Sequence, residues 1–393
     1  MNPYFLEYSL VGIAGLLFGA ALERGRMCFV LATNNIITAG DTKILEGILW
    51  AFGISVLIFG AVESLGIIPV QAAVQGVFPS GWYDLVGALF FGFGIGLCGA
   101  CMSGLIFRAS SGFTQNWMQL FGILIGTIFF AFIIFPMTNF LYWILHTIPW
   151  LGIKPGLSDY IPHEWFGKAV WGPFVVALIF GGFFMLFGLY LTKRRFKKIG
   201  EERGEKNYKE PVITWNMLKF KEPYSPRLGG LLFAVIAIIV LFASYYTVHK
   251  VAYLGVTTPY GSFDTYLLSP FINLYNVVGP YKASFLPKLS SNWFQIVPVA
   301  IPMTLMVLCT FAGATITAIL GGEFKWRVPR RKMMFLQNFI GGVFTGVGAR
   351  IALGCNIGTL WSGFLMFSWA GVLFLPTLVL GMYLALKFQE LVW

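Results

Sequence analysis

Charged residues are scarce in this chain, and histidine is rarer still. Only 11% of the 393 residues are charged and 58% are hydrophobic, whereas soluble globular domains carry about 25% charged residues, so the composition excludes that class. The three histidines, His146, His163 and His249, form no clustered set of four ligands, which argues against a structural zinc site. A Gly-Lys-Ser/Thr phosphate loop is also missing, so the chain does not hydrolyse ATP by that route.

Long apolar runs are the most prominent feature of the sequence. A helix needs about 20 apolar residues to cross the hydrocarbon core of a membrane. Runs of about that length occur nine times, at 4–23, 44–66, 84–106, 119–145, 170–192, 229–248, 297–320, 335–355 and 364–387. The first run has no basic segment before it and no small-residue cleavage site, so we expect a retained span rather than a signal peptide. The sequence therefore predicts an all-α polytopic membrane protein with about nine transmembrane helices.

The net charge of +11 is concentrated beside these runs. Basic clusters at 193–198 and 327–332 flank the fifth and eighth runs, which is typical of cytoplasmic loops against anionic lipid rather than of nucleic-acid binding. With an external N-terminus, the cytoplasmic segments hold 21 of the 27 Lys and Arg residues, the external segments hold five, and Arg350 lies inside a run. This asymmetry predicts an external N-terminus and a cytoplasmic C-terminus.

Two long connections divide the chain. The basic segment 193–228 is predicted to be a cytoplasmic linker between an N-terminal membrane half, 1–192, and a C-terminal membrane half, 229–393. Within the second half, the segment 249–296 is rich in Tyr, Pro and Ser, and we expect it to form short helices over the outer face. Neither connection contains a recognisable soluble domain.

An internal repeat links the two halves. FGFGIGLCGACMSGLIF (91–107) aligns with TGVGARIALGCNIGTLW (345–361). The matched pairs are Cys101 with Cys355, Gly92 with Gly346, Gly94 with Gly348 and Gly104 with Gly358. In the predicted topology the two copies run in opposite directions, which is the inverted repeat of many transporters. A fainter match, between 15–29 and 313–327, runs in the same direction and leaves open whether one of these segments is re-entrant.

The glycines of the repeat predict broken helices. Each Gly destabilises a helix interior by about 0.5–1 kcal/mol relative to Ala, so we expect the chain to leave the helix at 99–101 and at 354–355. Irregular backbone at membrane depth must face protein or a wet cavity. A half-helix resuming at Ser103 or Asn356 would point its free N–H groups at the break and favour an anion. Arg108 and Arg350 strengthen that preference.

Four stretches resemble one family of membrane proteins. GRMCF (25–29), GACMSGLIFRASSG (99–112), GGEFKWR (321–327) and GARIALGCNIG (348–358) resemble the YeeE/YedE family of sulfur-compound permeases, and the similarity spans both halves of the chain. The resemblance implies a permease of the prokaryotic inner membrane that imports thiosulfate or a related sulfur species, with no cofactor. A branch of the family is associated with selenium metabolism.

The resemblance also implies a set of substrate-path residues. Its three functional cysteines fall on Cys28, Cys101 and Cys355. Cys101, Ser103, Gly104 and Arg108 resemble the thiosulfate-type pattern, whereas the Gly-Cys-Asn-x-Gly of 354–358, which includes Asn356 and Gly358, leans toward the YedE branch, so the substrate stays open between them. A neutral thiol can donate weakly to the terminal sulfur of thiosulfate without the repulsion that a thiolate would cause. Three such thiols at successive depths would give the shallow binding steps that conduction needs.

Each of these side chains also has a structural interpretation. Cys309, among aliphatic residues, is predicted to pack only. Arg108 is compatible with snorkelling to the interface, Arg350 with pairing to backbone carbonyls, and Asn356 with capping a helix. Cys98 and Cys101 form a C-x-x-C, which suggests an alternative membrane thiol–disulfide oxidoreductase, although no second cysteine pair lies in an external loop to relay oxidation.

The driving force is a separate question. Moving one charge through 100 mV is worth about 2.3 kcal/mol, and a dianion entering a negative-inside cell costs roughly twice that. Glu46 and Glu63 lie at the two ends of the second run, and we interpret both as interfacial rather than as proton relays. We expect a sink instead, a cytoplasmic TusA-like sulfur-carrier protein of the kind associated with the family, docked on the basic cytoplasmic loops.

Overall fold

The computed structural model describes residues 3–68, 81–130, 161–166, 171–204, 211–218, 222–248, 297–352 and 354–392. These residues form helices, with a single isolated bridge between Phe113 and Arg327 and no strand within the described ranges. The helices are α1 (Pro3–Gly25), α2 (Phe29–Ala39), α3 (Lys43–Ser64), α5 (Trp82–Cys98), α6 (Met102–Ser110), α7 (Thr114–Phe129), α9 (Ile161–Phe166), α10 (Gly172–Arg203), α11 (Trp215–Leu218), α12 (Pro226–Val248), α15 (Val297–Leu320), α16 (Met333–Ile351), η4 (Asn356–Trp361), α17 (Ser362–Leu365) and α18 (Trp369–Val392).

The described helices confirm an all-α polytopic membrane protein. Five helical segments are long and apolar enough to cross a membrane, at 43–64, 82–110, 172–203, 333–365 and 369–391. Two of these segments contain the predicted breaks. The segment 82–110 joins α5 to α6, and the segment 333–365 joins α16 to η4 and α17. The total of nine spans remains a prediction, and the predicted outer segment 249–296 lies outside the described residues.

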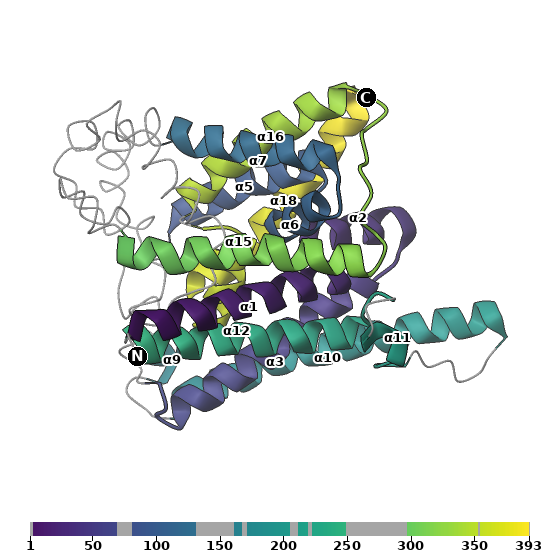
Figure 1. The fold of residues 1–393 in the computed structure, drawn as a ribbon. Coiled ribbons are helices and arrows are strands. Elements are labelled where there is room, and N and C mark those ends of the chain that lie inside the picture. The colour runs from purple at the N-terminus through teal and green to yellow at the C-terminus, as the bar shows by residue number, and fades with distance from the viewer. Residues whose placement is uncertain are drawn as a thin grey trace.

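The long helices form one bundle (Figure 1). On one side, α5 packs against α16 and α18, and α16 packs against α7. On the other side, α3 packs against α10 and α12, and α1 packs against α12 and α15. The N-terminus and the C-terminus lie at opposite ends of the bundle (Figure 1).

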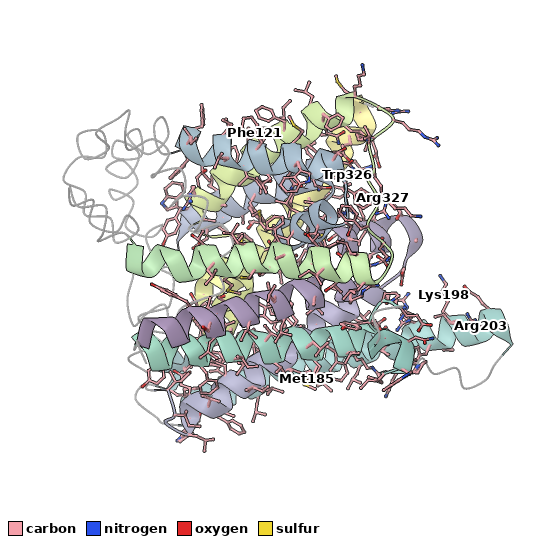
Figure 2. The ribbon with its side chains drawn as sticks, viewed as in Figure 1. Phe121, Met185, Lys198, Arg203, Trp326 and Arg327 are labelled. Atoms are coloured by element: carbon pink, nitrogen blue, oxygen red, sulfur yellow. The ribbon has the colours of Figure 1, made fainter. Side chains whose placement is uncertain are left out.

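One end of the bundle carries much of the positive charge. Helix α10 continues through the start of the predicted linker 193–228 and extends past the bundle, with Lys198 and Arg203 on this extension (Figure 2). The segment between α15 and α16 lies at the same end and carries Trp326 and Arg327. We call this end the basic end.

The repeat predicted from sequence has a structural counterpart in helix packing. Gly94 of α5 lies against Thr345 of α16, and Gly348 of α16 lies against Phe91 of α5. The two helices therefore run antiparallel. Gly94 and Gly348 are a matched pair of the repeat, so each helix contacts the other through the same repeat position. The other matched glycines are also equivalent, since Gly92 packs against α18 and Gly346 packs against α7, the helices that follow the two breaks. A Cβ at any of these four positions would overlap the neighbouring backbone.

The fainter match also appears in the packing. Gly15 and Gly19 of α1 lie against Met306 and Thr310 of α15, so these two helices run parallel, as the sequence predicts. Cys309 lies in this interface beside Gly15, in agreement with a packing role. The two helices end differently, because α1 is followed by the short helix α2 and α15 by an extended segment. Sequence analysis predicts no helix directly after Cys28 and therefore does not foresee α2.

Candidate functional site

All three predicted cysteines occupy the same structural position, the residue just before a short helix. Cys28 precedes α2, Cys101 precedes α6 and Cys355 precedes η4. Each has extended backbone, with φ of −136°, −79° and −106° respectively, and each is fully buried. A helix N-terminus exposes unpaired N–H groups and carries partial positive charge, so each sulfur lies where an anion is favoured.

The Cys-x-x-Gly spacing of the repeat is a helix cap. The N–H of Gly104 donates to Cys101 Sγ over 3.5 Å, and the N–H of Gly358 donates to Cys355 Sγ over 3.4 Å. The capping interpretation of Asn356 is therefore wrong, because the thiol one residue earlier takes that role. For the same reason, α6 begins at Met102 rather than at Ser103.

Cys28 and Cys101 form a pair of thiols in direct contact. Cys101 Sγ lies 3.1 Å from Cys28 Sγ and 3.0 Å from Ser103 Oγ. Gly104 makes this contact possible, since a Cβ there would lie 2.5 Å from Cys28 Sγ. Cys355 approaches the same region through η4, which packs against α6.

The two breaks lie near opposite ends of α5. The first follows Cys98, where the carbonyls of Gly96 and Leu97 accept hydrogen bonds from Gln389 near the C-terminus. The second begins at Ala352, which packs against Gly87 near the start of α5. Eleven residues of helix separate Gly87 from Cys98, which corresponds to about 16 Å at 1.5 Å per residue. The irregular backbone therefore approaches the centre from both ends of the bundle.

The two arginines of the site are both half-buried and both lie in the last turn of their helices. Arg108, on α6, turns back toward the first break, where its Nη1 would lie 3.8 Å from a Cβ at Gly99. Its charge acts on Cys28, and no carboxylate of the described residues forms an ion pair with it. Arg350 precedes the second break and is held by contacts of its own. The snorkelling interpretation of Arg108 does not fit a side chain directed toward the break.

The second break contains an unusual buried amide. Asn356 is fully buried, and neither its amide nitrogen nor its amide oxygen has a hydrogen-bond partner. It begins η4, a π-helix, and such segments occur often at functional sites. Five residues later the indole N–H of Trp361 is also buried without a partner, while its ring packs on Phe52 and Phe233. Two buried donors without partners in one turn of backbone make this turn a candidate polar site.

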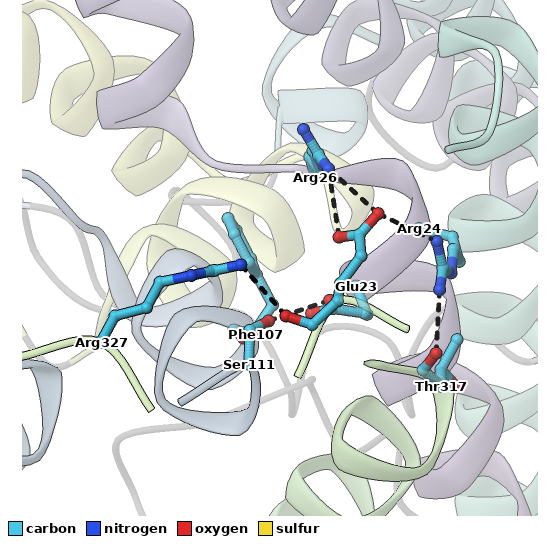
Figure 3. Close-up of polar contacts among 8 residues, drawn as sticks. Glu23, Arg24, Arg26, Phe107, Ser111, Thr317 and Arg327 are labelled. Atoms are coloured by element: carbon cyan, nitrogen blue, oxygen red, sulfur yellow. Dashed lines mark hydrogen bonds and ion pairs between the residues drawn. The ribbon is translucent and has the colours of Figure 1, made fainter. Parts of the chain in front are cut away.

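A polar cluster at the basic end joins three of the family-like stretches (Figure 3). Glu323 forms ion pairs with Arg24 over 3.2 Å and with Arg26 over 3.1 Å. Ser111 donates to Glu23 over 2.9 Å. Arg26 has φ of 48°, a left-handed conformation that few non-glycine residues adopt, at the turn between α1 and α2. Sequence analysis missed Glu23, Arg24 and Glu323, although the second, fainter match places GRMCF beside GGEFKWR.

The C-x-x-C cysteines face different neighbours. Cys98 donates to the backbone carbonyl of Asn338 on α16 over 3.3 Å, whereas Cys101 contacts Cys28. Cys98 is therefore a packing residue between α5 and α16. In the described part of the chain, no three His, Cys, Asp or Glu side chains are grouped to hold a metal ion.

Comparison with known proteins agrees with this architecture. A family described as sulphur transport matches residues 24–384. The thiosulfate transporter TsuA of Spirochaeta thermophila is 24% identical over 364 residues, which cover 89% of each chain. TsuA of Escherichia coli is 25% identical over 380 residues, covering 95% of this chain and 92% of the relative. The probable transporter YedE of Salmonella typhimurium is 28% identical over 126 residues, about a third of either chain (32% and 30%).

These matches cover both repeat copies and nearly all the described helices, and the relatives named are transporters rather than enzymes. The apolar helices and these relatives together indicate a multi-pass membrane transporter of sulfur compounds. The chain belongs to the sulphur transport family, the YeeE/YedE permeases.

Proposed function

We propose that this protein imports thiosulfate through a central constriction lined by Cys28, Cys101 and Cys355. The observation that carries the proposal is the thiol pair at 3.1 Å, placed at the N-termini of two short helices. Both relatives that align over most of the chain are named thiosulfate transporters, which supports the same substrate. Import, rather than export, rests on the sequence resemblance and on the predicted topology.

The first break suits the terminal sulfur of the substrate. Neutral S–H groups donate weakly, and a soft, polarizable sulfur accepts weakly, so binding would be shallow enough for release. Ser103 lies beside Cys101 and supplies a hydroxyl to the same position. The charge of Arg108 and the helix N-terminal N–H groups offset the negative charge of the substrate. Sulfate has only oxygen atoms and would gain less from the thiols.

The second break suits the oxygen atoms of the substrate. The amide nitrogen of Asn356 is a buried donor without a hydrogen-bond partner, and an oxygen atom of the substrate would supply one. Leaving such a group buried and unpaired costs about 1–3 kcal/mol, and this cost disappears on binding. Cys355 and Gly358 form the adjacent cap, and Arg350 ends the preceding helix. We therefore assign recognition of the terminal sulfur to the first break and recognition of the oxygen atoms to the second, at successive points of the path.

The position of the two breaks supports a short barrier. They are separated by about 16 Å along α5, which is about half the thickness of a bilayer core of about 30 Å. A path that opens from both ends toward η4 and α6 would leave only this distance to cross. The substrate would pass the cysteines one after another rather than bind to all of them at once.

The basic end would face the cytoplasm in this proposal. Its exposed Lys and Arg residues follow the positive-inside rule, which gives an external N-terminus and a cytoplasmic C-terminus. A TusA-like sulfur carrier could dock on the segment 321–334 and consume the substrate as it emerges. Pull-down of such a carrier with the intact protein, lost when Arg330, Arg331 and Lys332 are changed to Ser, is the expected result. Equal capture by both proteins would place the carrier elsewhere.

Uptake of ³⁵S-thiosulfate in a sulfur-auxotrophic host tests the function. We expect the wild type to restore uptake and growth on thiosulfate, and Cys101→Ser and Cys355→Ser to fail at equal membrane expression. If the wild type is expressed but does not restore growth, thiosulfate is the wrong substrate. The same strains would then be tested for uptake of selenium compounds, because the Gly-Cys-Asn-x-Gly stretch leans toward the YedE branch.

A further inference from the structure

Glu23 is a buried carboxyl group that lies close to Cys28 in the chain. It lies in the last turn of α1, five residues before Cys28, and is only 3% exposed. Its Oε1 accepts a hydrogen bond from Ser111, which directly follows α6, the helix that Cys101 caps. Glu23 therefore joins the end of α1, which leads to Cys28, to the C-terminal end of α6 (Figure 3).

One oxygen of this carboxyl group has no partner. Glu23 Oε2 is buried and makes no hydrogen bond, although the charges of Arg24, Arg26 and Glu323 act on this carboxyl group. A buried carboxylate with an unpaired oxygen is costly, whereas a carboxylic acid with its proton on that oxygen carries no charge. The geometry is thus suited to holding a proton for part of the time and releasing it for the rest.

The surrounding charges explain why Glu23 differs from its neighbours. Arg24 and Arg26 follow it on the chain, but both pair with Glu323, and Arg24 also donates to the carbonyl of Thr317 over 2.9 Å. Glu323 itself is a negative neighbour of Glu23. Arg327 donates to the backbone carbonyl of Glu323 over 3.1 Å.

Two further groups complete the environment of Glu23. Ser111, from the turn after α6, is its hydroxyl donor. Tyr224, from the segment before α12, lies beside Arg24, and burial raises the pKa of its phenol, so it stays protonated near neutral pH. The carboxyl of Glu23 is therefore the group of this cluster suited to exchange a proton during transport.

We propose that Glu23 carries the proton that is cotransported with the anion. The inference rests on the proposed function and adds the coupling of anion transport to a proton. A negative substrate at the thiol pair favours a protonated Glu23, and by reciprocity a protonated Glu23 favours the substrate. The proton binds at Oε2 while the path holds the anion and leaves to the cytoplasmic side after the anion does. No covalent bond of the substrate forms or breaks, and each proton carried cancels one negative charge.

Purified full-length protein in liposomes separates coupling from transport. Exchange of ³⁵S-thiosulfate against unlabelled internal thiosulfate at equal pH reports the path itself. Accumulation of label with acid outside reports coupling to protons. We expect the wild type to do both. Glu23→Gln should retain exchange and lose the increase in accumulation that the pH gradient causes.

Two matched variants keep the test decisive. Glu63→Gln changes another buried carboxyl group, at the far end of α3, and should retain both activities. Ser111→Ala removes the hydroxyl that lies 2.9 Å from Glu23 Oε1 and 2.7 Å from the carbonyl oxygen of Phe107. The pH midpoint of exchange should move upward, because the ionised carboxyl loses a hydrogen-bond donor. This shift requires titration of Glu23 and would not follow from a purely structural role.

The outcomes distinguish the two proposals. If wild-type protein shows no exchange, the proposed thiosulfate function fails. If exchange is normal and Glu23→Gln accumulates label as strongly as the wild type under the pH gradient, the coupling role of Glu23 is overturned while the function stands. Loss of the gradient response in Glu63→Gln alone would move the proton site to the opposite end of the bundle. If Glu23→Gln proves unstable in detergent, the direction of the Ser111→Ala shift decides the question.

Discussion

The two breaks of the repeat share a scaffold but present different chemistry. In both, a cysteine with extended backbone caps the following helix through the N–H of a glycine three residues later. The first continues as an α-helix, and its thiol contacts Cys28 and Ser103. The second continues as a π-helix and buries an amide without partners. An inverted repeat thus fixes where the backbone breaks, while residues outside the repeat motif decide what each break can bind.

The largest effect should come from removing the thiol of the first break. Cys101→Ala should reduce thiosulfate uptake about tenfold or more, corresponding to about 1.4 kcal/mol of barrier, because it removes both the donor and one partner of the pair. Cys98→Ala is the matched control, since that thiol faces α16. Uptake rates at equal expression compare the two. An equal loss in Cys98→Ala would favour a C-x-x-C mechanism instead.

The next largest effect should distinguish two glycines that are equivalent in the repeat. Gly104→Ala would place a Cβ 2.5 Å from Cys28 Sγ, whereas Gly358→Ala would place one 3.9 Å from Cys355 Sγ, an ordinary contact. Overpacking costs about 1–3 kcal/mol, so we expect Gly104→Ala to lower both thermal stability and uptake. Gly358→Ala should leave stability within about 0.5 kcal/mol. Thermal unfolding in detergent, followed by uptake, measures both. Equal tolerance at the two positions would mean that the thiol contact is not tight.

A third change separates stability from transport. Asn356→Leu removes a buried amide that has no partner, so the protein should become as stable as the wild type or more stable, by up to about 1–3 kcal/mol. Uptake should nevertheless fall, and the substrate concentration for half-maximal uptake should rise, because the oxyanion loses a donor. Thermal unfolding and uptake at several thiosulfate concentrations test this. Lower stability with unchanged uptake would show that the amide serves the fold.

The smallest effect should follow from the charge of Arg108. Arg108 is half-buried, and its attraction to the anionic substrate would be that of a partly solvated ion pair, about 0.2–1 kcal/mol. Arg108→Gln should therefore slow uptake by up to about fivefold. The loss should shrink at high ionic strength, because salt screens the attraction. Uptake measured from low to high salt gives this dependence. An effect of Arg108→Gln that does not change with salt would assign the side chain to packing.

Sequence alone supplied much of the scaffold. The apolar runs predict the long helices, and the glycines predict breaks that the structure places after Cys98 and after Ile351. Hydrophobicity and glycine content are local properties of the chain, so their structural effects can be predicted without knowing the contacts between distant segments. The spacing from Cys101 to Gly104 also contained the cap, since three residues separate a capping side chain from the N–H it accepts.

The remaining features depend on contacts between distant segments. The pair of Cys28 with Cys101 joins residues 73 positions apart, and the pair of Arg24 with Glu323 joins residues 299 apart. No periodic pattern in the sequence predicts such contacts. The interruption at Cys28 was missed because Arg26, rather than a glycine, adopts the left-handed turn there. The orphaned amide of Asn356 likewise becomes visible only when all its neighbours are in place.

A reversible disulfide between Cys28 and Cys101 would test directly whether these two thiols line the transport path. Their sulfurs lie 3.1 Å apart and would need to approach to about 2.05 Å. Oxidation of liposome-embedded protein with diamide, checked by mass spectrometry, should stop thiosulfate exchange, and dithiothreitol should restore it, while Cys28→Ala should resist oxidation. Full exchange by protein that demonstrably carries the Cys28–Cys101 disulfide would contradict the account.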